Sequence, residues 1–141
     1  MLTCHPHDPA PHSVFIVDDD AAVCRALALL ARSAGYQAVC FTSGDAFVEA
    51  SGNLPPGCAV VDVAMPGLDG PGVLAALRRD GNQMPVIFVT AHDRPAVHRQ
   101  LLEDGGRTVL LKPVDPAALL AEIRGSLEGQ PPGAPDLPAS P

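Results

Sequence analysis

Four apolar segments of the chain each end on side chains that could bind a metal ion or a phosphoryl group. These side chains belong to Asp18 and Asp19, Asp62, Thr90, and Lys112, the only lysine in the sequence. The carboxyl ends of neighbouring parallel strands meet at one edge of a sheet, and open α/β sheets bind their ligands there. Carboxylates, a hydroxyl group and one ammonium group gathered at such an edge could bind a divalent cation and a phosphoryl group.

The carboxylates predict a cation site. If their strands are neighbours, Asp18, Asp19 and Asp62 lie close together, and such charges repel by several kcal/mol at an effective dielectric constant of about 20. The repulsion favours protonation or a bound cation. Mg²⁺ (or Mn²⁺) suits the cluster, because the ion takes oxygen ligands and commonly uses one or two carboxylates plus a phosphate oxygen. We expect Asp20 to cap a helix instead.

Asp62 has two candidate roles, as a metal ligand and as a nucleophile. A carboxylate can accept a phosphoryl group and form an aspartyl phosphate. The protein then contributes mainly positioning and charge compensation. Lys112 can supply a compact cation for a phosphoryl oxygen, and Thr90 can supply a hydroxyl donor. We therefore predict that Asp62, Thr90 and Lys112 carry the phosphoryl chemistry.

The elements that would position these residues alternate between strand and helix five times. We expect strands at 14–17, 37–41, 58–62, 86–90 and 108–111, and helices at about 21–34, from Ser43, from Pro71, at about 94–104 and from Asp115. Short strands that are apolar throughout are typical of a parallel sheet covered on both faces. Right-handed crossovers then predict a single doubly wound, flavodoxin-like (βα)5 domain with strand order 2-1-3-4-5.

Helical spacing also predicts which side chains face the core. In the first helix these are Val23, Leu27, Leu30 and Ala34, and in the last helix they are Leu120, Ile123 and Leu127.

Composition and charge narrow the function further. The 141 residues include sixteen acidic and nine basic side chains, with no basic cluster, which argues against direct binding of nucleic acid. We expect a cytoplasmic protein without membrane contact, because no segment resembles a signal peptide and no apolar run approaches about 18 residues. Residues 1–12 are expected to be a flexible arm, 13–128 the domain, and 129–141 a Pro/Gly-rich disordered tail or linker.

Four motifs, VFIVDDD, VVDVAMPGLDG, VIFVTAHD and LLKPVD, resemble those of the receiver domains of two-component response regulators, the CheY-like superfamily. Their details are most similar to FixJ-type receivers, and the resemblance covers residues 13–128. It implies that Asp62 is the phosphoacceptor and that Asp18 and Asp19 bind Mg²⁺ with Asp62 and the backbone carbonyl of Ala64. Thr90 and Lys112 would contact the phosphoryl group.

The resemblance further implies a switch rather than an enzyme, with self-catalysed phosphoryl transfer and autodephosphorylation as its only chemistry. The expected donor is a sensor histidine kinase or a histidine phosphotransfer protein. The switch would act through protein–protein contacts with a downstream protein or output domain, and phosphorylation-dependent homodimers belong to the same expectation. A cis bond between Lys112 and Pro113 is also implied.

Two positions are expected to tune the lifetime of the phosphoryl group, and one departs from the family pattern. Ala64 and His92 flank the path of hydrolytic water in receivers, so their size and polarity should matter. Receivers commonly carry Tyr or Phe three residues before the lysine, and that ring moves inward when the threonine moves. Here the residue is Val109. Coupling of the phosphorylation site to the face built by the fourth helix, the fifth strand and the fifth helix should therefore use a different side chain or be altered.

Two other functions remain open from the residues alone. Asp18-Asp19-Asp20 after an apolar strand matches the D-x-D pattern of haloacid-dehalogenase-type phosphatases, in which Asp18 would be the nucleophile. A phosphorylation-independent adaptor that keeps only the receiver fold is the other alternative. The aspartate that becomes phosphorylated, and any turnover of phosphate esters, would discriminate between the three.

Overall fold

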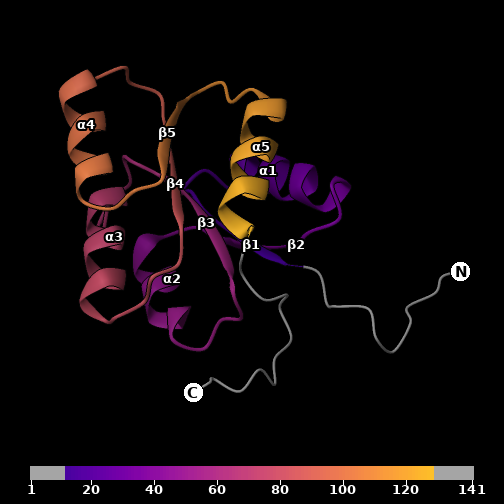
Figure 1. Cartoon of the computed structure of the whole chain (residues 1–141), viewed down its shortest axis with the longest axis horizontal. Helices are drawn as coiled ribbons and strands as arrows, with labels where there is room; N and C mark the ends of the chain where they lie inside the picture. Colours follow the sequence, from indigo (N-terminus) through magenta and orange to yellow (C-terminus); the bar gives the residue numbers. More distant parts are fainter. Residues whose placement is uncertain (1–11, 129–141) are drawn as a thin grey trace, which may run out of the picture.

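The computed structural model describes residues 12–128, in which five strands alternate with five helices (Figure 1). The strands are β1 (Ser13–Val17), β2 (Gln37–Phe41), β3 (Gly57–Asp62), β4 (Val86–Thr90) and β5 (Thr108–Leu111). The helices are α1 (Ala21–Ser33), α2 (Gly44–Ser51), α3 (Gly70–Arg79), α4 (Pro95–Glu103) and α5 (Pro116–Leu127). All strand pairs are parallel, and their order is β2-β1-β3-β4-β5, which confirms the predicted topology.

Helices cover both faces of the sheet (Figure 1). Alternate strand residues point to opposite faces, so Ile16 belongs to the core beneath α1 and α5, whereas Phe15 belongs to the core beneath α2, α3 and α4. Strands β1, β3 and β4 are buried along their whole length, as their continuous apolar sequences predict. Burial of each large side chain contributes roughly 1.5–3 kcal/mol to folding.

The helices begin at the polar residues that the sequence singles out. The Asp20 side chain accepts hydrogen bonds from the backbone N–H groups of Ala22 and Val23, at 2.9 and 3.3 Å. Asp115 caps α5 in the same manner, just before Pro116. These contacts satisfy amide groups that have no partner within a helix.

The loop between β3 and α3 turns back tightly onto the end of β3, and Gly70 permits this approach. A Cβ atom at Gly70 would lie 2.8 Å from Cα of Val63 and 2.9 Å from the carbonyl oxygen of Asp62. The loop that follows Asp62 is therefore held against the strand by the absence of a side chain at this position.

The predicted core faces of two helices were partly wrong. The buried positions of α1 are Cys24, Ala28 and Ala31. Leu27 and Leu30 only flank this face, and Ala34 is the exposed C-cap residue. In α5, Leu119 is buried and Leu120 only partly so, while Ile123 and Leu127 are buried as predicted. The α1 stripe is shifted because small side chains let the helix lie close to the sheet, while the leucines fill the margins.

The predicted arm and tail cannot be compared with the fold, because residues 1–11 and 129–141 lie outside the described residues. Among residues 12–128, no helix has the length and apolar character that crossing a membrane requires.

Candidate functional site

The sheet brings the predicted site residues to one edge. Asp18 follows the last residue of β1, and Asp62 ends the adjacent strand β3. Thr90 ends β4 and pairs in register with Leu111, so Lys112 lies directly beyond β5. The backbone N–H of Lys112 donates to the carbonyl of Thr90 at 2.7 Å. The carboxyl ends of β1, β3, β4 and β5 therefore meet at one edge of the sheet.

Three carboxylates form an acidic cluster at this edge. Ligand oxygens of Asp18, Asp19 and Asp62 all lie within 4.8 Å of one another. Asp18 and Asp62 are buried and Asp19 is exposed, so the cluster opens to solvent on one side. Oδ1 of Asp18 accepts a hydrogen bond from the backbone N–H of Asp20 at 2.9 Å, which fixes the orientation of this carboxylate. The arrangement provides hard oxygen donors for a divalent cation.

Lys112 forms ion pairs with both buried carboxylates. Its Nζ atom donates to Oδ2 of Asp18 at 3.0 Å and lies 3.4 Å from Oδ1 of Asp62. Burial alone would lower the pKa of Lys112, but the hydrogen bond and charge of Asp18, with a smaller contribution from Asp62, outweigh it. The pKa is therefore raised, and Lys112 remains a cation at neutral pH.

The pKa of Asp62 is raised above its usual value of 3.8, mainly by burial and then by the negative charge of Asp18. The charge and hydrogen bond of Lys112 oppose this shift, as does a hydrogen bond from the backbone of Ala64. Asp62 is thus a carboxylate whose charge is only partly compensated by its protein neighbours. A cation bound at the cluster would complete the compensation.

Thr90 is buried at the end of β4, next to the strand that carries Asp62. Its Oγ1 atom accepts a hydrogen bond from the backbone N–H of His92 at 3.1 Å. A hydroxyl group that accepts in this way still has its own hydrogen available for donation.

A small cavity of about 210 Å³ adjoins Thr90 and contains both predicted tuning residues. Ala64 and His92 line it, and their side chains are exposed. Arg94 and His98 line it as well, and neither was predicted as a site residue. Their four-residue spacing at the start of a predicted helix could have identified them as neighbours, since residues at this spacing share one helix face.

Two further expectations concern the neighbourhood of Lys112. The bond between Lys112 and Pro113 is cis, as predicted. Val109 pairs in register with Phe88 and is half-buried against the core beneath α2, α3 and α4. It occupies the position at which the resemblance leads one to expect an aromatic ring.

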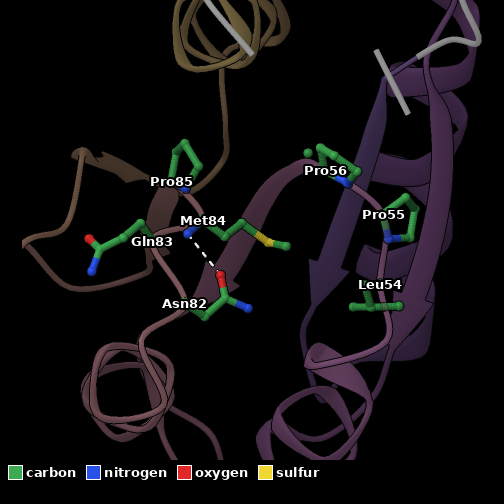
Figure 2. Close-up of a pocket in the computed structure, with 8 residues that line it drawn as sticks. Leu54, Pro55, Pro56, Asn82, Gln83, Met84 and Pro85 are labelled. Carbon is green, nitrogen blue, oxygen red and sulfur yellow. Dashed lines mark hydrogen bonds between the residues drawn. The ribbon is translucent and has the colours of Figure 1, made fainter. Parts of the chain in front are cut away.

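A separate pocket of about 350 Å³ lies at the opposite edge of the sheet, before the first residues of β3 and β4. Figure 2 shows its lining, in which the side-chain oxygen of Asn82 accepts the backbone N–H of Met84 at 2.9 Å. The pocket is lined by prolines, amides and apolar side chains, and none of them is charged or nucleophilic. This pocket therefore offers no side chain that could take part in phosphoryl transfer.

Comparisons with known sequences agree with this geometry. The model of the response regulator receiver domain family matches residues 14–124. The transcriptional regulatory protein FixJ of Azorhizobium caulinodans is 39% identical over 119 residues, which are 84% of this chain and 56% of that protein. The response regulator protein TmoT of Ectopseudomonas mendocina is 37% identical over 115 residues, which are 82% of this chain and 52% of TmoT. The chain thus spans about half the length of these relatives.

Solved structures give the same result. Full-length FixJ from B. japonicum superimposes with a TM-score of 0.78 at 31% identity, covering 84% of this chain and 58% of that one. A putative response regulator from Chloroflexus aurantiacus superimposes with a TM-score of 0.74 at 32% identity, covering 83% of this chain and 98% of that one.

Proposed function

Because the chain belongs to the family of response regulator receiver domains, the phosphorylation-controlled switches of two-component systems, we propose that Asp62 is its phosphoacceptor. The donor would be the phosphohistidine of a sensor histidine kinase or a histidine phosphotransfer protein. The observation that carries the proposal is the place of the Asp62 carboxylate, which ends a central strand within 3.4 Å of Lys112 Nζ. A carboxylate oxygen would form a bond to phosphorus as the phosphorus–nitrogen bond of the donor breaks.

The cation in this proposal is Mg²⁺ (or Mn²⁺). Asp18, Asp19 and Asp62 would hold it together with the backbone carbonyl of Ala64. The donor set fits such an ion, because three carboxylates bring their oxygens within 4.8 Å of one another and, among the described residues, only Lys112 forms ion pairs with two of them. When bound, the ion would supply positive charge between the carboxylates and the incoming phosphoryl oxygens.

Lys112 and Thr90 would stabilise the phosphoryl group once it is attached. Lys112 already lies against the Asp62 carboxylate, so its ammonium group can turn to a phosphoryl oxygen with little movement. Thr90 can donate its hydroxyl hydrogen, since its oxygen only accepts in the contact with His92. Donors of this kind stabilise the charge that develops on the transferred group.

Ala64 and His92 would set how long the phosphoryl group survives. Both line the cavity that adjoins Thr90, and a methyl group at Ala64 leaves that cavity open to water. The imidazole of His92 can hydrogen bond to water or to a phosphoryl oxygen. Autodephosphorylation, together with self-catalysed phosphoryl transfer, would be the only reactions of this site.

The phosphorylated protein would signal through protein–protein contacts made by its receiver domain, residues 13–128. Residues 129–141 have the composition of a linker to a downstream output domain or of a tail on a protein that binds its target directly. A phosphorylation-dependent homodimer is part of the same proposal. The phosphoryl transfer and these protein–protein contacts would take place in the cytoplasm.

Neither alternative is favoured by the comparisons, which match response regulators along most of the described chain. A phosphorylation-independent adaptor would have no reason to keep the acidic cluster, Thr90 and Lys112 together at one edge.

The test is intact-mass spectrometry after incubation with acetyl phosphate and Mg²⁺. We expect one phosphoryl adduct on the wild type, none on Asp62→Ala, and none when the ion is chelated. Asp104→Asn, which changes the exposed carboxylate of the C-cap residue of α4, should behave as the wild type. An adduct that persists in Asp62→Ala, or a wild type without an adduct, would contradict the proposal.

A further inference from the structure

The loop between β4 and α4, residues 91–94, connects Thr90 to the first turn of α4. Its N-cap residue, Arg94, makes no side-chain capping bond, and the next residue, Pro95, favours a helix start but has no N–H group to donate. Contacts from another side chain can therefore add to the hold on this loop.

The imidazole of His98 supplies these contacts. Its Nε2 atom lies 3.1 Å from the carbonyl oxygen of His92 and 3.3 Å from the backbone nitrogen of Arg94. As an N–H group this nitrogen donates to the carbonyl, and as a lone pair it accepts from the amide of Arg94, so either tautomer keeps the ring on the loop. A side chain one turn into the helix thus reaches back to the N-cap backbone, as a capping-box residue does.

His92 ties the same loop to the hydroxyl group of Thr90. The backbone N–H of His92 donates to Oγ1 of Thr90 at 3.1 Å, and the backbone carbonyl of His92 faces the ring of His98. A continuous path of polar contacts therefore runs from Thr90 through one residue of backbone to α4. If the Thr90 hydroxyl moves, the peptide groups of His92 must move with it or lose a contact.

We propose that His98 is a positioning residue that holds this loop in its unphosphorylated arrangement and couples Thr90 to α4. The inference rests on the proposed function, because the phosphoryl group on Asp62 is what would draw Thr90 away. Val109 cannot take this part, since its aliphatic side chain is half-buried against the core and offers no polar contact. His98 gives this chain a route to its outer surface that does not pass through an aromatic ring on β5.

The proposal predicts the direction of an effect on phosphoryl binding. We assign the contacts of His98 to the unphosphorylated arrangement because they hold the loop while Oγ1 of Thr90 accepts from the His92 N–H, so their loss should shift the population toward the phosphorylated arrangement. Beryllofluoride, a phosphoryl mimic that would bind Asp62 with Mg²⁺, should then bind His98→Ala more tightly. The expected change is about fivefold, which corresponds to one net hydrogen bond.

The experiment compares the full chain with three variants. His98→Ala removes the ring, and His98→Gln restores a group that can both donate and accept. Gln100→Ala is the matched control, since Gln100 lies on the same helix but bonds only to Asp104 by its side chain. We would measure amide hydrogen exchange at Arg94 without any ligand, the beryllofluoride affinity with Mg²⁺, and the phosphoryl adduct by intact mass.

We expect faster exchange at Arg94 and tighter beryllofluoride binding in His98→Ala, recovery of both in His98→Gln, and wild-type values in Gln100→Ala. Unchanged exchange and affinity in His98→Ala, with a normal adduct, would overturn the role of His98 and leave the proposed function intact. A wild type that forms no adduct and binds no beryllofluoride would overturn the proposed function and the coupling with it. The ligand-free exchange measurement distinguishes the two failures.

Discussion

Replacing Lys112 by Met removes the charge that compensates two buried carboxylates while keeping an unbranched side chain of similar length. Nζ lies 3.0 Å from Asp18 and 3.4 Å from Asp62, so each attraction amounts to about 5 kcal/mol at an effective dielectric constant of about 20. Desolvation offsets much of this attraction in the wild type. The variant loses the attraction, while Asp18 and Asp62 stay buried beside each other.

The expected loss of stability is about 2–3 kcal/mol at neutral pH without divalent ions. Removing one partner of a fully buried pair costs about 3–5 kcal/mol. The lysine side chain is 24% exposed, so water would solvate the carboxylates in part and the cost should fall below that range. Because a cation at the acidic cluster would replace the missing charge, we expect Mg²⁺ to recover more stability in Lys112→Met than in the wild type.

Urea unfolding at pH 7, with chelator and with Mg²⁺, measures both effects. Arg107→Met is the matched control, since it breaks the exposed ion pair with Glu122 at 3.2 Å and should cost less than about 1 kcal/mol. A loss in Lys112→Met that is no larger than in the control would refute the reasoning. So would a Mg²⁺ effect equal to that of the wild type.

Two further outcomes follow from the same site. The first outcome concerns the raised pKa of Asp62 in the absence of metal. At pH values between 3.8 and the raised pKa, the folded protein binds a proton at Asp62 that the unfolded chain does not bind. Asp62 therefore makes the free energy of unfolding increase as the pH falls into that range. Thermal unfolding from pH 7 to 4 should show this rise in the wild type and a weaker one in Asp62→Asn; equal slopes would contradict it. Gly70→Ala should cost about 1–3 kcal/mol and slow acceptance of the phosphoryl group, because its Cβ would press on the backbone of Val63 and Asp62. Normal stability and a normal adduct rate in that variant would show that the loop can move away.

Much of the fold could be predicted because each local signal agreed with the others. The apolar runs that end on Asp62 and Thr90 are the central strands, and Asp20 and Asp115 cap helices as their positions suggest. These features depend on residues within one or two turns of each other, and local propensities act over that distance. The regular alternation of strand and helix, with right-handed crossovers, then predicted the doubly wound strand order.

The core face of α1 shows where periodicity was insufficient. A stripe through Val23 and Leu27 and a stripe through Cys24 and Ala28 both repeat at helical spacing. Hydrophobicity favours the leucine stripe, whereas the structure buries the stripe of smaller side chains. The choice depends on how closely the helix can approach the sheet, and that distance is a property of both packing surfaces.

By itself the sequence determined the chemistry available at each strand end and the order of the elements, because residue type and local pattern suffice for both. Only the tertiary structure decided which groups touch. The contact between Lys112 and Asp18 joins residues 94 positions apart, and its 3.0 Å length follows from the register of several strands. The place of the His98 ring depends on the path of a four-residue loop, which no periodicity encodes. The distances between atoms of the site arise from packing across the whole sheet. The pattern of apolar and polar residues along the chain does not determine distances to within an ångström.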